Sequence, residues 1–309
     1  MRKILAITGG VGGAKLALGL AKILPPDEVL FVVNTGDDFE HLGLSICPDI
    51  DTLTYTLADL NNTELGWGRR GETWNCLDTL AALGGENWFR LGDHDLALHL
   101  HRTARLRAGA SLTEVTREIT ANLGIAHTMV PMCDQPVRTI VHAEHGPMAF
   151  QHYFVRDRCA PAVTGFHFEG IDTARLSPVL EAFLDQCTGV LICPSNPFVS
   201  VDTVLAVPGM RAGLARLPVV AVSPIVGGTA IKGPTAKMMQ ELKIPATAAQ
   251  VAAHYGDLLD GFVLDEQDAA LHGQLGTATA VTRTIMVTLE DRIELARTCV
   301  GFLEQLPRR

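Results

Sequence analysis

The sequence predicts an α/β fold in which a Rossmann-like, mostly parallel sheet carries helices on both faces. Short apolar runs suited to strands buried on both faces alternate with helical segments along the 309 residues. The first run leads into a glycine-rich turn and an amphipathic helix, in the stretch KILAITGGVGGAKLALGLAK from Lys3 to Lys22. Such a βαβ unit is almost always right-handed, and ligands bind beyond the carboxyl ends of its strands.

The glycine-rich turn is predicted to be a phosphate cradle. Free N–H groups and the helix dipole stabilise an anion at a helix start, and four glycines let the main chain approach it, namely Gly9, Gly10, Gly12 and Gly13. The turn departs from a P-loop at Ala14 and Leu16, and Lys15 spoils the end of the dinucleotide fingerprint. A Rossmann dehydrogenase is therefore disfavoured, and a tight turn without a ligand is a further alternative.

The second strand is predicted over Val29 to Asn34, and acidic residues follow it. Asp37 and Asp38 stand just beyond this strand, at the edge where ligands gather. Apolar spacing then predicts a helix from Leu53 to Leu60, opened by the side chain of Asp49 or Asp51.

An inserted second lobe is predicted between two parts of a nucleotide-binding core. The core would comprise residues 1–63 and 160–309, and the insertion residues 64–159. Helical patterns run from Glu72 to Leu83, from Leu91 to Ala108 and from Ser111 to Leu123, where Ser111 and Glu114 form a capping box. Alternation over residues 128–156, with a reversal at His145-Gly146, predicts a β-hairpin.

The α/β rhythm returns after the insertion. Strands are expected at Gly189 to Cys193, Val219 to Val222, Gly261 to Asp265 and near Ala280 to Met286; helices at Pro178 to Gln186, around Val201, Lys237 to Leu242, Ala248 to Tyr255 and Asp291 to Leu303. The loops PSNPFVS and SPIVGGTAIKGP follow the first two of these strands, so both are expected to line a pocket.

Composition limits the classes of partner. A net charge of −9 argues against a nucleic-acid surface, which needs clustered lysine and arginine. No apolar stretch is long enough to span a membrane, and the start MRKILAITGG runs directly into a strand, so a cytoplasmic protein is expected. The seven cysteines are scattered, without the pairs that a zinc knuckle or disulfide framework would need.

Several acidic and basic residues are candidates for chemistry. Closely spaced aspartates beside a phosphate cradle suit Mg²⁺, and the pairs are Asp37-Asp38, Asp49-Asp51, Asp93-Asp95 and Asp265-Asp268, although each pair has a helix cap as its alternative. Candidate phosphate-binding cations are Lys15, Arg69, Arg70, Arg90, Arg102, Lys232 and Lys237. Arg90 stands out because it interrupts an apolar stretch. The histidines show no metal-ligand spacing, and no G-x-S-x-G elbow occurs.

Eight motifs, taken in order, resemble one family. They are GGVGGAKL (9–16), NTGDD (34–38), CPDIDT (47–52), LGDHDLALHLHRT (91–103), PMCDQPVRT (131–139), FQHYFV (150–155), PSNPFVSV (194–201) and SPIVGGTAIKGP (223–234). This set resembles the 2-phospho-L-lactate transferase family of deazaflavin coenzyme (factor 420) biosynthesis, over almost the whole chain.

The resemblance implies a transfer reaction. The terminal ribityl hydroxyl of the deazaflavin Fo would attack the phosphorus of a guanosine-diphospho acid, and GMP would leave, with magnesium as the metal. The acid itself, lactyl, enolpyruvyl or glyceryl, is left open by the sequence. Such chemistry asks the protein mainly for positioning and charge stabilisation.

The same resemblance implies roles for particular residues. Asp51 and Arg90 would contact Fo, and Asp51 would orient the hydroxyl or take its proton. From placement rather than from the resemblance, Lys15 is expected to steady the diphosphate, and Asp37 or Asp38 is expected to organise magnesium. The guanosine diphosphate part would be held by the glycine loop and by two further loops, at Ser195, Asn196, Pro197, Ser223, Gly227 and Gly228.

Two other functions compete with the transferase. A related set of proteins binds nucleotide-sugars and regulates without established catalysis, and an NAD-dependent dehydrogenase is more distant. The lysine in the glycine loop, CPDIDT and LGDHDLA favour the transferase. A homodimer is expected on base rates alone.

Overall fold

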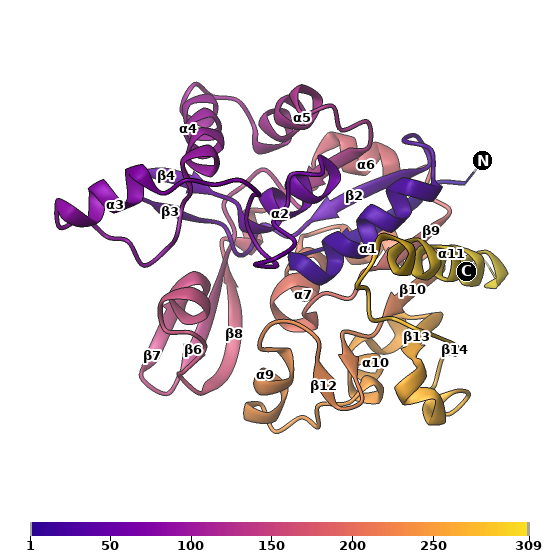
Figure 1. Cartoon of the computed structure of the whole chain (residues 1–309). Coiled ribbons are helices and arrows are strands. Elements are labelled where there is room, and N and C mark those ends of the chain that lie inside the picture. Colours follow the sequence, from indigo (N-terminus) through magenta and orange to yellow (C-terminus); the bar gives the residue numbers. More distant parts are fainter. Residues whose placement is uncertain (1, 308–309) are drawn as a thin grey trace.

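A seven-stranded parallel sheet forms the centre of the protein, as the computed structural model shows for residues 2–307 (Figure 1). Its strand order is β14-β13-β10-β9-β1-β2-β5, and every neighbouring pair is parallel. The strands are β1 (Ile4–Thr8), β2 (Val29–Val33), β5 (Thr128–Pro131), β9 (Gly189–Ile192), β10 (Val219–Val222), β13 (Gly261–Asp265) and β14 (Ala278–Thr282). The predicted α/β fold with a Rossmann-like sheet is confirmed.

Two hydrophobic cores cover the two faces of this sheet. Because side chains alternate along a strand, Ile4 and Ala6 of β1 enter one core while Leu5 and Ile7 enter the other. The first core is closed mainly by α1 (Gly10–Ile23), α2 (Pro48–Leu57) and α11 (Leu289–Gln305). The second is closed mainly by α6 (Pro178–Leu184), α7 (Asp202–Ala206), α8 (Met210–Leu214) and α10 (Ala248–Tyr255).

The strand order reverses between β1 and β9. From β1 the chain builds outward through β2 and β5, whereas β9 begins the run through β10, β13 and β14. In open α/β sheets the ligand crevice lies outside the carboxyl ends of the strands at such a reversal. The loops after β1 and β9 therefore mark where a site is expected.

Helix α2 begins earlier than its apolar pattern predicted. Pro48 occupies its first turn, where a missing N–H costs nothing, and Cys47 is the N-cap residue. The prediction that Asp49 or Asp51 opens the helix was therefore wrong. Both aspartates lie in the first turn with buried side chains, which frees them for another role.

The predicted insertion contains helices and a hairpin, but its boundaries do not match those of the two sheets. The helices are α3 (Asn75–Ala82), α4 (Asp93–Arg107) and α5 (Leu112–Asn122), and the capping box of α5 is confirmed. The hairpin of β6 (Arg138–Ala143) and β7 (Gly146–Ala149) is joined by β8 (Val163–Glu169) in a three-stranded sheet. However, β5 lies within residues 64–159 and belongs to the main sheet, while β8 lies beyond them, so neither sheet follows these boundaries.

Short elements complete the chain. They are the hairpins β3 (Phe39–His41) with β4 (Leu44–Ile46) and β11 (Ile225–Val226) with β12 (Thr229–Ala230), and helix α9 (Thr235–Glu241). The π-helical segments are η1 (His152–Arg156) and η3 (Pro197–Val201), and the 3₁₀ segments are η2 (Ile171–Thr173), η4 (Gly256–Leu258) and η5 (Glu266–Leu271). Within residues 2–307, no helix has the length and apolarity needed to cross a membrane. All seven cysteines are free thiols.

Candidate active site

The glycine turn and the loop after β9 meet at the strand-order reversal. The Ser195 hydroxyl donates to the Gly9 carbonyl at 2.8 Å and accepts from the Gly9 N–H at 3.1 Å. A Cβ on Gly12 would lie 2.5 Å from the carbonyl oxygen of Pro194. Only glycine permits this approach, so the two loops that were predicted to share a pocket do lie against each other.

Asp49 points its carboxylate at the start of α1. The Gly10 N–H and the Asn34 amide, the latter at 2.9 Å, both donate to it. A Cβ on Gly9 would stand 2.9 Å from Oδ2 of Asp49. Burial raises the pKa of Asp49 to about 6, although these two hydrogen bonds oppose the rise. The cradle therefore already faces an acid.

Asp37 and Asp38 bring two more buried carboxyl groups to this edge. Burial, together with the charge of Asp49, raises the pKa of Asp37 well above its ordinary range. Burial raises the pKa of Asp38 to about 7, against hydrogen bonding from Cys47. Oδ1 of each is buried and has no hydrogen-bond partner among residues 2–307. Uncompensated buried oxygens of this kind suit a cation.

These carboxyl groups do not by themselves form a closed metal cage. In the described part of the chain, no three His, Cys, Asp or Glu side chains are grouped to hold a metal ion. Magnesium, however, commonly takes one or two carboxylates and completes its shell with water and substrate phosphates. The unpartnered oxygens of Asp37 and Asp38 fit that mode of binding.

Asp51 lies beside the acidic group but is paired with an arginine. Both of its oxygens contact the Arg102 guanidinium, one of them at 3.1 Å. Nδ1 of His99 lies 3.7 Å from Oδ2 of Asp51. All three residues are buried, and Arg102 is only 1% exposed. Asp51, which was predicted to contact Fo, is thus held in place by Arg102 and His99 of α4.

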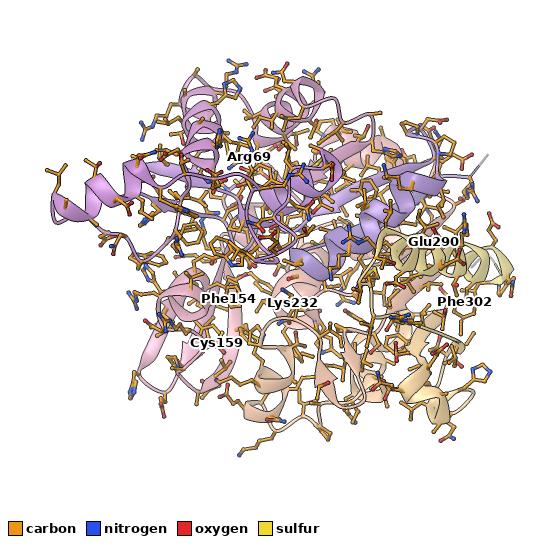
Figure 2. The ribbon with its side chains drawn as sticks, in the orientation of Figure 1. Arg69, Phe154, Cys159, Lys232, Glu290 and Phe302 are labelled. Atoms are coloured by element: carbon orange, nitrogen blue, oxygen red, sulfur yellow. The ribbon has the colours of Figure 1, made fainter. Side chains whose placement is uncertain are left out.

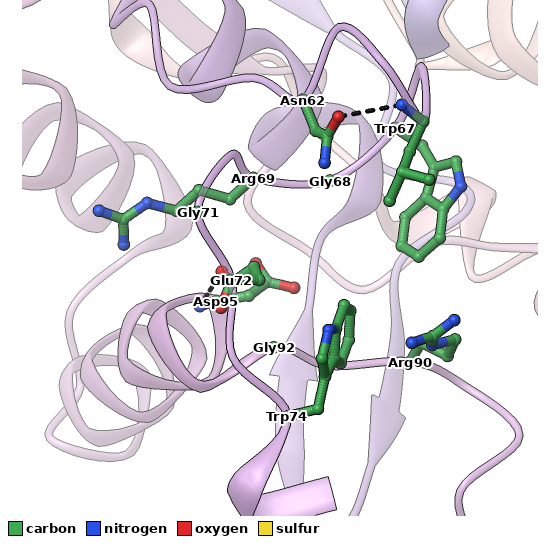
Figure 3. Close-up of a pocket in the computed structure, with 11 residues that line it drawn as sticks. Asn62, Trp67, Gly68, Arg69, Gly71, Glu72, Trp74, Arg90, Gly92 and Asp95 are labelled. Atoms are coloured by element: carbon green, nitrogen blue, oxygen red, sulfur yellow. Dashed lines mark hydrogen bonds between the residues drawn. The ribbon is translucent and has the colours of Figure 1, made fainter.

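Arg90 lines a separate pocket of about 170 Å³ (Figure 3). Its guanidinium lies 4.2 Å from the centre of the Trp74 ring, an arrangement typical of a cation–π contact. Trp67 lies across the pocket from this pair, and Asp95 and Glu72 form the acidic side. A flat aromatic ligand with polar edges matches such a lining.

Asp95 connects the pocket to Asp51. It lines the pocket, accepts from the Tyr55 hydroxyl, and has Oδ2 3.3 Å from Nε2 of His99. Burial opposes ionisation, but hydrogen bonds from His99 and Tyr55 lower the pKa of Asp95. Arg90 and Asp51, expected to share a substrate, are therefore linked indirectly through α4.

Lys15 of α1 belongs to a group of neighbouring cations. Its ammonium donates to the carbonyl of Met286 at 2.8 Å. Burial and the charges of Arg292 and Lys232 lower its pKa. Lys232, labelled in Figure 2, extends from the β12–α9 loop to Gly66, whose added Cβ would meet its ammonium. A group of neighbouring cations that lower the pKa of Lys15 would be stabilised by an anionic ligand.

The remaining predicted loop residues mainly shape the backbone. Asn196 caps η3 by accepting from Phe198 N–H at 3.0 Å, and Pro197 occupies the first turn. The Ser223 hydroxyl bonds both backbone groups of Ile225. Gly227 and Gly228 form the left-handed turn between β11 and β12. These residues set loop shape, and their ligand contacts stay predictions.

In the two other acidic pairs, one member of each caps a helix start, namely Asp93 and Asp265. Asp93 accepts hydrogen bonds from the backbone of Asn75 and Cys76 and from two side chains at the start of α3, which lowers its pKa to about 2. Asp265 accepts from Thr284 and Gln267, and Asp268 accepts from Gly227. The alternative of a structural cap therefore holds for Asp93 and Asp265, while Asp268 fixes the turn at Gly227.

The sequence predicted Arg102 only as a candidate phosphate-binding cation and Asp95 only as part of a candidate magnesium pair, and it predicted no role for His99 or Tyr55. In the structure Arg102 is instead paired with Asp51. A signal was present, because Asp95, His99 and Arg102 follow an i, i+4, i+7 spacing and so share one face of a helix. A buried face made of an acid, a histidine and an arginine is unusual, since charged residues are rarely buried unless they are paired.

The chain matches known transferases over nearly its full length. The family model described as 2-phospho-L-lactate transferase CofD covers residues 4–294. A phosphoenolpyruvate transferase of Kitasatospora aureofaciens is 40% identical, over 98% of each chain. A 2-phospho-L-lactate transferase of Methanosarcina mazei is 38% identical, over 96% of this chain and 99% of its own length.

A solved structure shares the fold at low sequence identity. A UPF0052 family protein from Bacillus halodurans superposes with a TM-score of 0.63 at 12% identity, covering 97% of this chain and 98% of that one. This likeness supports the α/β architecture alone. The family model and the full-length relatives go further: the chain belongs to the 2-phospho-L-lactate transferase family, and it is an enzyme of the transferase type.

Proposed function

We propose that this transferase moves a phosphate-bearing three-carbon acid from a guanosine-diphospho donor to the terminal ribityl hydroxyl of Fo, releasing GMP. One observation carries the proposal. The glycine turn at the strand-order reversal is connected, through Asp49, Asp51 and the partners of Asp51 on α4, to a separate pocket that holds Arg90 and Trp74. A two-substrate transfer needs such a pair of adjoining sites.

The donor half is the cradle. Its diphosphate would meet the N–H groups at the start of α1, with Lys15 neutralising charge nearby. Asp49 already faces these N–H groups, so an arriving diphosphate would suffer repulsion unless a cation came with it. This argument supports magnesium held by Asp37 and Asp38 together with the phosphates. When bound, the ion would neutralise charge on the phosphate oxygens.

The acceptor half is the pocket of Arg90. The deazaflavin ring would stack against Trp74 or Trp67, and the arginine would bind its carbonyl groups. The ribityl chain would extend past Asp95 toward Asp51. There the Asp51 carboxylate would accept a hydrogen bond from the terminal hydroxyl, which would direct a lone pair of the hydroxyl oxygen at phosphorus. Both Asp51 oxygens already accept from Arg102, which favours orientation of the hydroxyl over removal of its proton.

The bonds in the reaction balance simply. The ribityl oxygen forms a bond to the phosphorus that carries the acid, the bond from that phosphorus to the bridging oxygen breaks, and GMP leaves with that oxygen. The hydroxyl proton is lost to solvent or to the departing phosphate. Developing charge falls on oxygens that face the cradle, so electrostatic stabilisation there supports the rate.

Incubation with Fo, Mg²⁺ and each of the lactyl, enolpyruvyl and glyceryl donors tests the proposal. We expect GMP and a phosphodiester product in equal amounts, and competition with mass analysis identifies the preferred acid. Absence of GMP with all three donors would contradict the proposal. Donor binding without turnover would instead support the nucleotide-binding regulator. Cytoplasmic location and a homodimer stay predictions.

A further inference from the structure

Arg102 makes the most unusual contacts of any charged residue near the site. It lies on α4, yet its guanidinium is buried against the first turn of α2, where it forms a two-pronged ion pair with Asp51 and lies 3.4 Å from the Ser45 carbonyl oxygen. A fork of this kind fixes the plane of the carboxylate as well as its position. The pair therefore determines how Asp51 faces its surroundings.

The tautomer of His99 follows from the same arginine. Nη1 of Arg102 lies 3.2 Å from Nδ1 of His99. Because a guanidinium has no acceptor, Nδ1 must accept this hydrogen bond, and the ring proton then sits on Nε2. Nε2 faces Oδ2 of Asp95 at 3.3 Å. The ring thus has a defined orientation between two carboxylates.

These contacts form a continuous path between the two halves of the site. Asp51 shares the first turn of α2 with Asp49, which contacts the cradle. Beyond Arg102 and His99, Asp95 lines the pocket of Arg90. The path thus joins the lining of the Arg90 pocket to the helix turn that contacts the glycine turn.

We propose that Arg102 and His99 are positioning residues that hold the Asp51 carboxylate toward the acceptor alcohol, and that Asp95 contacts the acceptor where its ribityl chain leaves the pocket. This inference rests on the proposed function. A lysine at position 102 would keep the charge but lose the fork, so the carboxylate would be free to rotate away from the alcohol.

The main test compares Arg102→Lys with the wild-type chain in the transfer assay. We expect KM for Fo to rise about tenfold and kcat to fall, while KM for the guanosine donor stays within about twofold. A partly unfolded variant would lose apparent kcat without changing either KM. Arg105→Lys is the matched control, because Arg105 lies on the same helix and pairs with Glu118 at the outside.

A double-mutant cycle separates positioning from folding. Arg102→Met leaves a buried acid unpaired and is expected to be unstable, whereas Arg102→Met combined with Asp51→Asn removes both charges. If Arg102 acts through Asp51, adding Arg102→Met to Asp51→Asn changes KM for Fo by less than about twofold. Asp95→Asn should raise KM for Fo and leave KM for the donor unchanged.

The outcomes distinguish this inference from the proposed function. An active wild-type chain with additive effects of Arg102→Met and Asp51→Asn would overturn the positioning role alone. Equal increases in both KM values for Arg102→Lys would also overturn it, since they would indicate a general distortion. A wild-type chain that releases no GMP with any donor would overturn the proposed function and this inference together.

Discussion

Three aspartates within a short stretch of the chain take different roles because their neighbours differ. Asp49 accepts from the Gly10 N–H, Asp51 is paired with Arg102, and Asp38 keeps an unpartnered oxygen. All three are buried, so burial alone does not distinguish them. Partners that come from α1 and α4 decide which acid contacts the glycine turn and which is held in an ion pair.

Substitution of Arg90 tests the acceptor pocket at the level of one side chain. We expect Arg90→Met to raise KM for Fo about tenfold, because a charge-assisted hydrogen bond to the ring is lost. KM for the guanosine donor should not change. Arg70→Met is the control, since Arg70 is exposed and donates to the Asp59 carbonyl. Equal effects of the two substitutions would argue against a ligand contact by Arg90.

Gly12→Ala tests the donor side. The added methyl group would press on the Pro194 carbonyl at 2.5 Å, so the two loops must separate. We expect a cost of about 1–3 kcal/mol in the free energy of unfolding and a rise in KM for the donor, with KM for Fo little affected. Urea denaturation and steady-state kinetics measure both. Gly301→Ala, at an open position inside α11, should be neutral or stabilising.

The sequence predicted where the loops lie relative to the strands, but it did not predict side-chain pairs between residues far apart in the chain. Strand-end placement predicted that the loop after β9 lines a pocket, and this loop contacts the glycine turn through Ser195 because the two loops follow adjacent strands. The pairing of Asp51 with Arg102 joins residues 51 positions apart. No local pattern specifies such a pair, since it depends on how α4 packs against α2.

At the scale of elements, α3 and α4 are held together by reciprocal caps. Asp93 in the first turn of α4 accepts from the start of α3, while Glu72 accepts from the N–H groups of His94 and Asp95 at 2.9 Å each. Trp74 precedes α3, so this exchange also fixes one wall of the pocket. Carboxylates are favoured at helix starts by both hydrogen bonding and the dipole.

Loss of the Asp93 cap should therefore loosen the pocket without touching the cradle. In Asp93→Ala we expect faster amide hydrogen exchange in α3 and a raised KM for Fo, with KM for the donor unchanged. Ser111→Ala is a matched cap control, because it removes the cap of α5 away from the pocket. The same increase in KM for Fo in both variants would contradict a specific role for Asp93.

Element boundaries show which sequence signals were reliable. The β-strand at Gly261–Asp265 and the helix at Ala248–Tyr255 were predicted with the bounds observed, since both have clean apolar patterns. By contrast, β5 was absorbed into the predicted hairpin. Its alternation looks like that of β6, but parallel pairing with β2 is a long-range contact that a local period cannot reveal.

At the scale of the whole molecule, the anion site proposed at the sheet edge lies beside several buried acidic residues. The N–H groups of α1 favour a diphosphate, yet Asp37, Asp38 and Asp49 surround the approach. In water such acids would ionise well below neutral pH. The fold raises their pKa values, so stability, pH and cation binding become linked.

This linkage makes a prediction for the metal-free chain. The pKa values of Asp38 and Asp49, about 7 and about 6, lie above those of the unfolded chain. Their contribution to stability is present at about pH 4 and is lost as pH rises through these values. Between pH 5.5 and pH 8 in EDTA, we expect the free energy of unfolding to fall by an amount on the order of 2 kcal/mol.

Magnesium should reverse this loss, because a cation at Asp37 and Asp38 stabilises the ionised carboxylates. Thermal unfolding with and without Mg²⁺ at both pH values measures the effect, and we expect a larger rise in Tm at pH 8 than at pH 5.5. Asp38→Asn should weaken both the pH dependence and the magnesium effect, whereas Asp27→Asn, at an exposed acid, should change neither. A magnesium effect of equal size in Asp38→Asn and the wild-type chain would exclude Asp38 as a ligand, and the cation would then have to be held by the other acids.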